Sequence, residues 1–190
     1  MWVKLGIALG RPLAVSFSRD ITVDGAPGTD PRDAGHLAAQ ELVLRLARGH
    51  GRKANVELPT RPHDPAAWAD LVLQDDPART LMLVEIVNRA GDVGAGARNT
   101  DRKVADLERF AILAGGDEGP YRVASGWLLV DTAANRQLVA RYPEVLRARF
   151  PGSSAAWASA LANGTAPPDE PAIAWIDPRS GRIFPMRRRA

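Results

Sequence analysis

The chain has 190 residues, of which 45% are hydrophobic, and this is enough for one domain with a core of its own. It contains no cysteine, so a disulfide framework and a thiolate zinc site are both excluded. No apolar run approaches the roughly 20 residues that span a bilayer, and the start of the chain lacks the apolar stretch of a signal peptide. We therefore expect a cytoplasmic protein that has no membrane partner, and its formal charge of +3 mildly favours a polyanionic one.

Residues 1–33 are expected to form an N-terminal flank or linker. Within it, residues 13–17 have the composition of a short strand, and residues 24–33 are rich in Gly, Pro and Asp. A helix is predicted over residues 33–48, because an aspartate precedes an apolar stripe of helical period and Gly49 follows it.

Three strands are predicted next, over residues 54–58, 68–74 and 80–88, and the last two are apolar enough to be buried on both faces. A long helix is expected over residues 94–114, because two glycines follow it. Residues 121–131 then have the pattern of another buried strand. The predicted order is αβββαβ, which is typical of an α/β fold.

The remainder of the chain is predicted to hold helical segments around residues 135–150 and 153–163. Two short apolar runs follow, at residues 172–176 and 182–186, on either side of a turn. These would add C-terminal helices and a short hairpin to the α/β core, so we expect one domain over residues 34–190.

Two acidic residues lie within the apolar strands. Glu85 is the only charged residue in the segment Leu-Met-Leu-Val-Glu-Ile-Val, and Asp70 lies within Trp-Ala-Asp-Leu-Val-Leu one strand earlier. Removing an unpaired carboxylate from water costs several kcal/mol, so such a group is normally paired, bound to a metal or protonated. Both residues are therefore candidates for a functional site.

The loop between the two strands predicts how these acids are arranged. If residues 76–79 form a four-residue hairpin loop, Asp75 pairs with Thr80, and the antiparallel register places Asp70 opposite Glu85. Their Cβ atoms would then be roughly 5 Å apart on one face of the sheet. Because like charges repel, a bound cation is the natural compensation, and oxygen ligands suit Mg²⁺ or Mn²⁺.

An alternative explanation of the acids needs no metal. Either carboxylate could lie at the end of a strand and pair with an arginine inside the fold, and a slip of one residue in the register would place the two on opposite faces.

The element order and several short motifs resemble the PD-(D/E)XK nuclease superfamily. The likeness is greatest to a nuclease-like domain of actinobacteria that usually follows a helix-turn-helix, although residues 1–33 show no such pair of helices. The segments that carry the resemblance are residues 68–73, 84–88, 92–98, 101–105 and 142–145. It implies a restriction-endonuclease-like core with a mixed central sheet flanked by helices.

The resemblance also implies roles for individual residues. Asp70 and Glu85 would bind Mg²⁺ or Mn²⁺, and Glu41 on the first helix would orient the metal or a water molecule. In such enzymes the metal lowers the pKa of a bound water and stabilises charge on the phosphate, while a lysine assists the nucleophile. The lysine of the motif would occupy position 87, which is Val87 in this chain.

Lys103, on the following helix, is the candidate to replace that lysine in the catalytic group. Arg98 and Arg102 are four residues apart and so lie on one side of the helix, where they would contact DNA phosphates together with Asn88 at the end of the strand. A solvated helix surface, paired with neighbouring aspartates, explains the two arginines equally well.

Three functions remain open. The first is a metal-dependent nuclease-like domain that hydrolyses DNA phosphodiester bonds, the second is a nuclease fold that has lost catalysis and serves DNA-binding regulation or protein assembly, and the third is an interaction domain whose acids form internal salt bridges. DNA is the expected partner, and a homodimer is compatible with the sequence. No role is assigned to His36, His50 or His63, which are too scattered for a zinc site.

Overall fold

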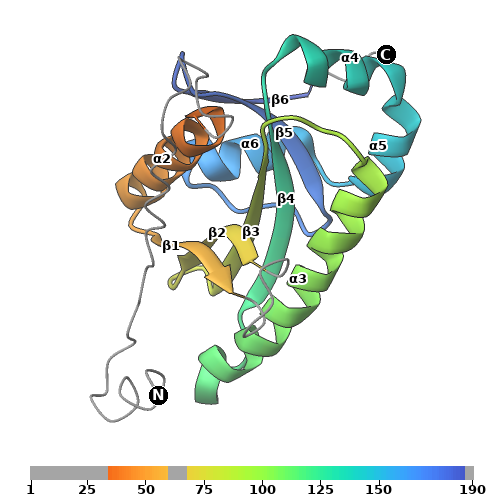
Figure 1. The fold of residues 1–190 in the computed structure, drawn as a ribbon. Coiled ribbons are helices and arrows are strands. Elements are labelled where there is room, and N and C mark those ends of the chain that lie inside the picture. The colour runs from red at the N-terminus through yellow and green to blue at the C-terminus, as the bar shows by residue number, and fades with distance from the viewer. Residues whose placement is uncertain (1–33, 60–67, 187–190) are drawn as a thin grey trace, which may run out of the picture.

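The structure is a computed structural model that describes residues 34–59 and 68–186. These residues form a six-stranded sheet whose strands lie side by side in chain order, with helices on both faces (Figure 1). The strands are β1 (Lys53–Pro59), β2 (Trp68–Asp75), β3 (Thr80–Val87), β4 (Arg122–Val130), β5 (Ala172–Asp177) and β6 (Arg182–Pro185). The helices are α2 (Ala34–Gly49), α3 (Val93–Gly115), η2 (Gly116–Glu118), α4 (Ala133–Arg141), α5 (Pro143–Arg149) and α6 (Ser154–Asn163).

The sheet is mixed. β1, β2 and β3 form an antiparallel meander, β3, β4 and β5 are parallel to one another, and β6 returns antiparallel to β5. Parallel neighbours need a long crossover, which α3 supplies between β3 and β4 and the helices α4 to α6 supply between β4 and β5.

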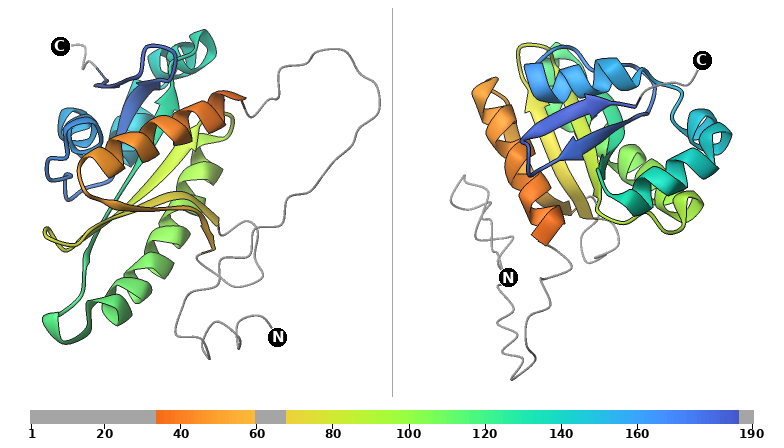
Figure 2. Two further views of the ribbon diagram at one scale, coloured as in Figure 1. Left: turned by 90° about the vertical axis from the view of Figure 1, so that its left-hand side faces the viewer. Right: turned by 90° about the horizontal axis from the view of Figure 1, so that it is seen from above.

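The helices form two layers, one on each face of the sheet (Figure 2). On one face Val43 of α2 and Trp157 of α6 share a buried cluster with Val84 of β3. On the other face Leu107 of α3 packs with Leu83 of β3, and α4 and α5 cover the neighbouring part of the sheet. Because successive residues of a strand point to opposite faces, the apolar sequence of β3 supplies both cores.

The expected α/β class is confirmed, with a six-stranded mixed sheet flanked by helices and with the order αβββαβ from α2 to β4. The C-terminal hairpin was expected as an addition to the core, whereas β5 and β6 extend the central sheet. The helical segment predicted around residues 135–150 is divided at Tyr142, because Pro143 lacks the N–H that would continue α4 and instead begins α5. The restriction-endonuclease-like identity of the core stays a prediction.

Two expectations fall partly or wholly outside the described residues. The strand-like run at residues 13–17 and the flank that contains it are not described, and neither is the predicted capping residue Asp33. Within the described part of the chain, every helix is too short or too polar to cross a bilayer.

The hairpin register between β2 and β3 is the predicted one. Asp75 pairs with Thr80, and the ladder continues to Leu71, which pairs with Val84. The loop closes with a hydrogen bond from the Arg79 N–H to the Asp76 carbonyl oxygen at 3.1 Å. The ladder stops one pair before Asp70 and Glu85, so both acids lie where the two strands begin to separate.

Close packing on the α6 face depends on Gly126 in the middle of β4. A Cβ atom at this position would lie 2.6 Å from Cε2 of the fully buried Trp157 and would also collide with the carbonyl oxygen of Ala172. The backbone of β4 can therefore approach α6 and β5 only because residue 126 has no side chain.

We expect Gly126→Ala to lower the free energy of unfolding by about 1–3 kcal/mol, because the added methyl group overfills a closed core. Urea denaturation followed by circular dichroism measures the change. Gly49→Ala is the matched control, since among the described residues only the adjacent backbone of the same helix comes within 4 Å of a Cβ placed at Gly49. Equal unfolding midpoints for the two variants would contradict the close contact at Gly126.

Candidate functional site

A buried ion pair joins α3 to the sheet. The Nζ atom of Lys103 donates to Oε2 of Glu85 at 2.7 Å, and the side chains of Lys103 and Glu85 are 5% and 12% exposed. Lys103 lies in the stripe of α3 that faces the sheet, with Thr100 before it and Leu107 after it at helical spacing. The carboxylate that interrupts the apolar sequence of β3 therefore has a cationic partner on the next helix.

The ion pair leaves part of the Glu85 carboxylate unsatisfied. Oε1 is buried and has no hydrogen-bond partner of ordinary geometry among the described residues. Burial raises the pKa of Glu85 from 4.5 to about 7, and the neighbouring Asp70 carboxylate adds to the rise. Lys103 and, more weakly, the backbone N–H of Asp70 oppose the rise without cancelling it. A carboxylate in this state is suited to bind a cation or to exchange a proton near neutral pH.

Asp70 lies beside Glu85 and connects β2 to two other elements. Its Oδ2 accepts a hydrogen bond from the backbone N–H of Ile86 at 2.8 Å, beyond the end of the β2–β3 ladder. Its Oδ1 lies 3.8 Å from Nε2 of His36 in the first turn of α2, and both side chains are about one quarter exposed. Asp70 is thus held in place but accessible to solvent.

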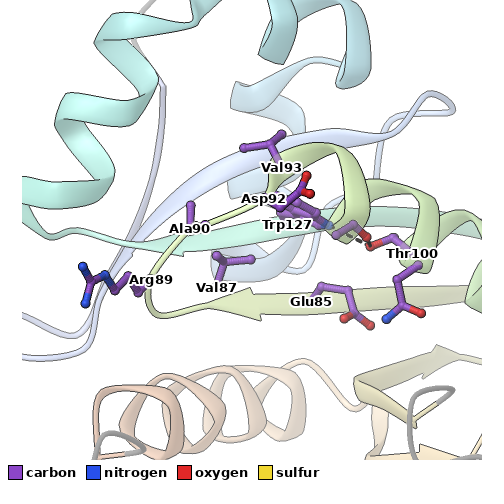
Figure 3. A pocket seen from close by; sticks show the side chains of 11 residues that line it. Glu85, Val87, Arg89, Ala90, Asp92, Val93, Thr100 and Trp127 are labelled. Atoms are coloured by element: carbon purple, nitrogen blue, oxygen red, sulfur yellow. Dashed lines mark hydrogen bonds between the residues drawn. The ribbon is translucent and has the colours of Figure 1, made fainter.

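A cavity of about 200 Å³ adjoins the ion pair on the α3 side (Figure 3). It is bounded by β3, by the loop that leads into α3, by the first turns of α3, and by β4. The residues that line it are Glu85, Val87, residues 89–93, Gly96, Asn99, Thr100 and Trp127.

Trp127 is the cross-strand neighbour of Glu85 in the parallel β3–β4 register. Its indole N–H donates to the Thr100 hydroxyl at 2.9 Å, which fixes the ring against α3. A Cβ atom at Gly96 would lie 2.9 Å from the edge of the indole, so the glycine allows this approach. The wall of the cavity beside Glu85 is therefore rigid.

The structure brings three of the predicted catalytic residues together and places the fourth elsewhere. Asp70, Glu85 and Lys103 form one group, as described above. Glu41 is exposed on α2, outside the buried stripe that contains Leu42 and Val43, and a catalytic role for it stays a prediction.

The predicted DNA-binding residues lie near the same end of the sheet. Arg98 and Arg102 are exposed on α3, and a Cβ atom at Gly94 would lie 3.3 Å from a guanidinium nitrogen of Arg98, so that side chain passes over the start of the helix. Asn88 is half-buried, and its amide lies against Gly35 in the first turn of α2. Contact between these residues and DNA stays a prediction.

His36 was given no role from the sequence, and the structure places it against Asp70. The signal that could have indicated it is helical spacing, because His36, Ala39 and Val43 follow one another at intervals of three and four residues on the buried face of α2. The lining residues Asn99 and Trp127 were also missed, since a cavity that forms between elements cannot be recognised from the sequence of any one element.

Two carboxylates fit a Mg²⁺ or Mn²⁺ site in their chemistry. The buried Oε1 of Glu85 needs a partner, and Asp70 supplies a second oxygen donor beside it. Mg²⁺ is commonly bound through one or two carboxylates, with water and substrate phosphate completing its coordination. Among the described residues, no group of three or more His, Asp or Glu side chains is arranged to hold a metal, so any such site would have to be of this two-carboxylate kind.

Comparison with known proteins gives no relative of this chain: no family model, no curated protein and no solved structure matches it. Its function must therefore be inferred from its own residues and their geometry.

We expect Lys103→Met to raise the pKa of Glu85 above its value of about 7, because the nearby cation that lowers this pKa would be lost. Titration of the Glu85 carboxyl carbon by ¹³C NMR measures the shift. Arg102→Met is the control, since Arg102 is exposed on the same helix, and it should leave the pKa unchanged. A pKa that is the same in all three proteins would show that the ion pair does not form in solution.

The raised pKa also predicts the pH dependence of stability. The folded protein binds the Glu85 proton more tightly than the unfolded chain, whose pKa is the ordinary 4.5. The contribution of this group to stability is therefore fully present below about pH 4.5 and is lost as the pH rises through about 7. Thermal melts of wild type and Glu85→Gln between pH 4 and 9 should diverge over this window, and parallel curves would contradict the prediction.

Proposed function

We propose that this chain is a metal-dependent nuclease-like domain that hydrolyses DNA phosphodiester bonds. The observation that carries the proposal is the contact of Lys103 with Glu85 beside Asp70. This contact supplies an acid from each of two adjacent strands and a lysine, which are the groups that the PD-(D/E)XK resemblance requires. The lysine comes from α3, and the strand position that the motif would use is Val87.

Each residue of the group has a distinct role in the proposal. Asp70 and Glu85 hold the divalent ion, which when bound lowers the pKa of a water molecule and neutralises charge on the phosphate. Lys103 lowers the pKa of the buried Glu85 and so favours its ionised form. It also presents N–H donors beside the carboxylate, where they can reach the attacking water or the phosphate. Neither strand needs to move for the group to form.

DNA is the proposed substrate because the elements that carry the group also carry exposed arginines. Arg98 and Arg102 project from α3, and the exposed Arg89 lies at the end of β3. A guanidinium donates in a planar fork that matches phosphate oxygens, so residues of this kind can hold a nucleic-acid backbone over the carboxylates.

Wild-type protein with Mn²⁺ or Mg²⁺ is expected to cleave plasmid or single-stranded DNA. Asp70→Asn, Glu85→Gln and Lys103→Met should each reduce the rate at least about 100-fold, because each removes a charge that stabilises the transition state. Gel assays of the four proteins measure this.

Glu108→Gln is the matched control, since Glu108 is exposed on α3 away from the group, and it should cleave as fast as wild type. Cleavage that is absent in wild type, or that persists equally in Glu85→Gln, would contradict the proposal.

A second function is favoured by the closed form of the ion pair. Lys103 already neutralises Glu85, and both side chains are nearly buried, so the pair can act as an internal salt bridge. The fold would then be a catalytically inactive module that serves DNA-binding regulation or protein assembly.

Metal binding separates the two functions. For a catalytic site, saturation with Mn²⁺ should stabilise wild type, by about 2.7 kcal/mol at 100 times the dissociation constant, and should not stabilise Asp70→Asn. Thermal melts with and without Mn²⁺, together with calorimetric titration, measure this. An unchanged melting temperature and no heat of binding would favour the inactive module.

A further inference from the structure

The cavity beside Glu85 is not used by the chemistry proposed above, which needs only the acids and Lys103. It lies against one of those acids and is bounded on its other sides by Trp127, by the first turns of α3 and by the loop from β3 (Figure 3). A substrate phosphate held at Glu85 would therefore have this cavity as its neighbour.

We infer that the cavity binds the unpaired single-ring base of a nucleotide whose phosphate lies at the acids, so that the substrate is a single-stranded or locally unpaired DNA with a pyrimidine at this position. The inference rests on the proposed function, because it takes the substrate to be DNA. It adds a base-binding site and a preference for pyrimidines, and neither follows from the two acids alone.

The size of the cavity selects one ring. A closed apolar cavity of roughly 150 Å³ is large enough to hold benzene. The volume here is about 200 Å³, which leaves room for a six-membered ring with its exocyclic groups. The cavity is open on one side, so the second fused ring of a purine would remain outside it, whereas a pyrimidine fits between the walls.

The walls have the chemistry that an unpaired base needs. The Trp127 indole is fixed by its hydrogen bond to Thr100, and Val87 and Ala90 add apolar surface. Asn99 is half-buried on α3 and offers both a donor and an acceptor through its amide, which is the pairing ability that a base edge requires. Pockets for extruded bases combine aromatic or apolar walls with a few such polar groups.

Charge at the rim fits the phosphates on either side of the base. Arg89 lines the cavity and is exposed, and the guanidinium of Arg98 passes over Gly94 at the start of α3. Asp92 also lines the cavity, and its Oδ1 accepts a hydrogen bond from the Ala95 N–H at 2.8 Å as the N-cap of α3. Duplex DNA would have to unpair before a base could enter, and the free-energy cost of unpairing favours single-stranded substrates.

The test is binding of deoxynucleosides, which carry no phosphate, to the full chain without metal, measured by calorimetry and by NMR chemical shifts. Thymidine and deoxycytidine should bind at least tenfold more tightly than deoxyadenosine and deoxyguanosine. Val87→Phe fills the cavity from β3 and should weaken pyrimidine binding at least tenfold. Asn99→Ala should weaken it about threefold to tenfold, since one or two hydrogen bonds are lost.

Val145→Phe and Asn55→Ala are the matched controls, because they make the same changes at exposed positions on α5 and β1. Both should bind pyrimidine deoxynucleosides as wild type does, and melting curves should show that all four variants fold. No pyrimidine binding, equal binding of purines, or unchanged binding by folded Val87→Phe would each overturn the inference.

The result of the binding test can be distinguished from the result of the cleavage test of the proposed function. Binding without any metal-dependent cleavage would retain the base site and reject the nuclease. Cleavage without deoxynucleoside selectivity would retain the nuclease and reject the base site.

Discussion

The contact between Lys103 and Glu85 constrains the whole α3 side of the molecule. Glu85 is the only charged residue of β3, and a carboxylate in that position is stabilised in its ionised form by a cationic partner. Supplying the partner from α3 fixes the rotation of that helix, because Thr100, Lys103 and Leu107 must all face the sheet. The same rotation leaves Arg98 and Arg102 exposed. The ion pair thus determines which side chains of α3 can meet a substrate.

The crossover from β3 through α3 to β4 explains why a cavity forms next to this pair. In a parallel pair joined by a helix, the carboxyl ends of both strands and the start of the helix meet at one edge of the sheet, which is where open α/β sheets commonly bind ligands. Here the close approach of Gly96 to Trp127 holds the helix start against β4, while the loop after β3 curves around the opening. Glu85 and the cavity therefore belong to one connection, and Asp70 is added to them by the β2–β3 hairpin.

Local sequence determined the hairpin but not the wider site. Loop length and alternation were sufficient to predict the pairing of Asp75 with Thr80, and hence the nearness of Asp70 to Glu85, because a hairpin register depends on residues close in the chain. The ends of α2 and α3 also followed from glycines, although the effect of Pro143 was missed. His36 could not be assigned, because its contact with Asp70 depends on how α2 docks across the sheet. Packing between distant elements of this kind has no local signature.

Position 87 shows how the location of the lysine affects the rest of the site. A lysine at this position would project from β3 on the same face as Glu85, into the space that the cavity now occupies. With Val87 there and the ammonium supplied by Lys103, the charge approaches Glu85 from the helix and the strand face remains apolar. In the proposed complex, the apolar face of β3 would contact the base in the cavity, while Lys103 and Glu85 would lie beside the phosphate. Valine at position 87 therefore leaves room for the cavity, and it is compatible with the proposed nuclease because Lys103 supplies the ammonium.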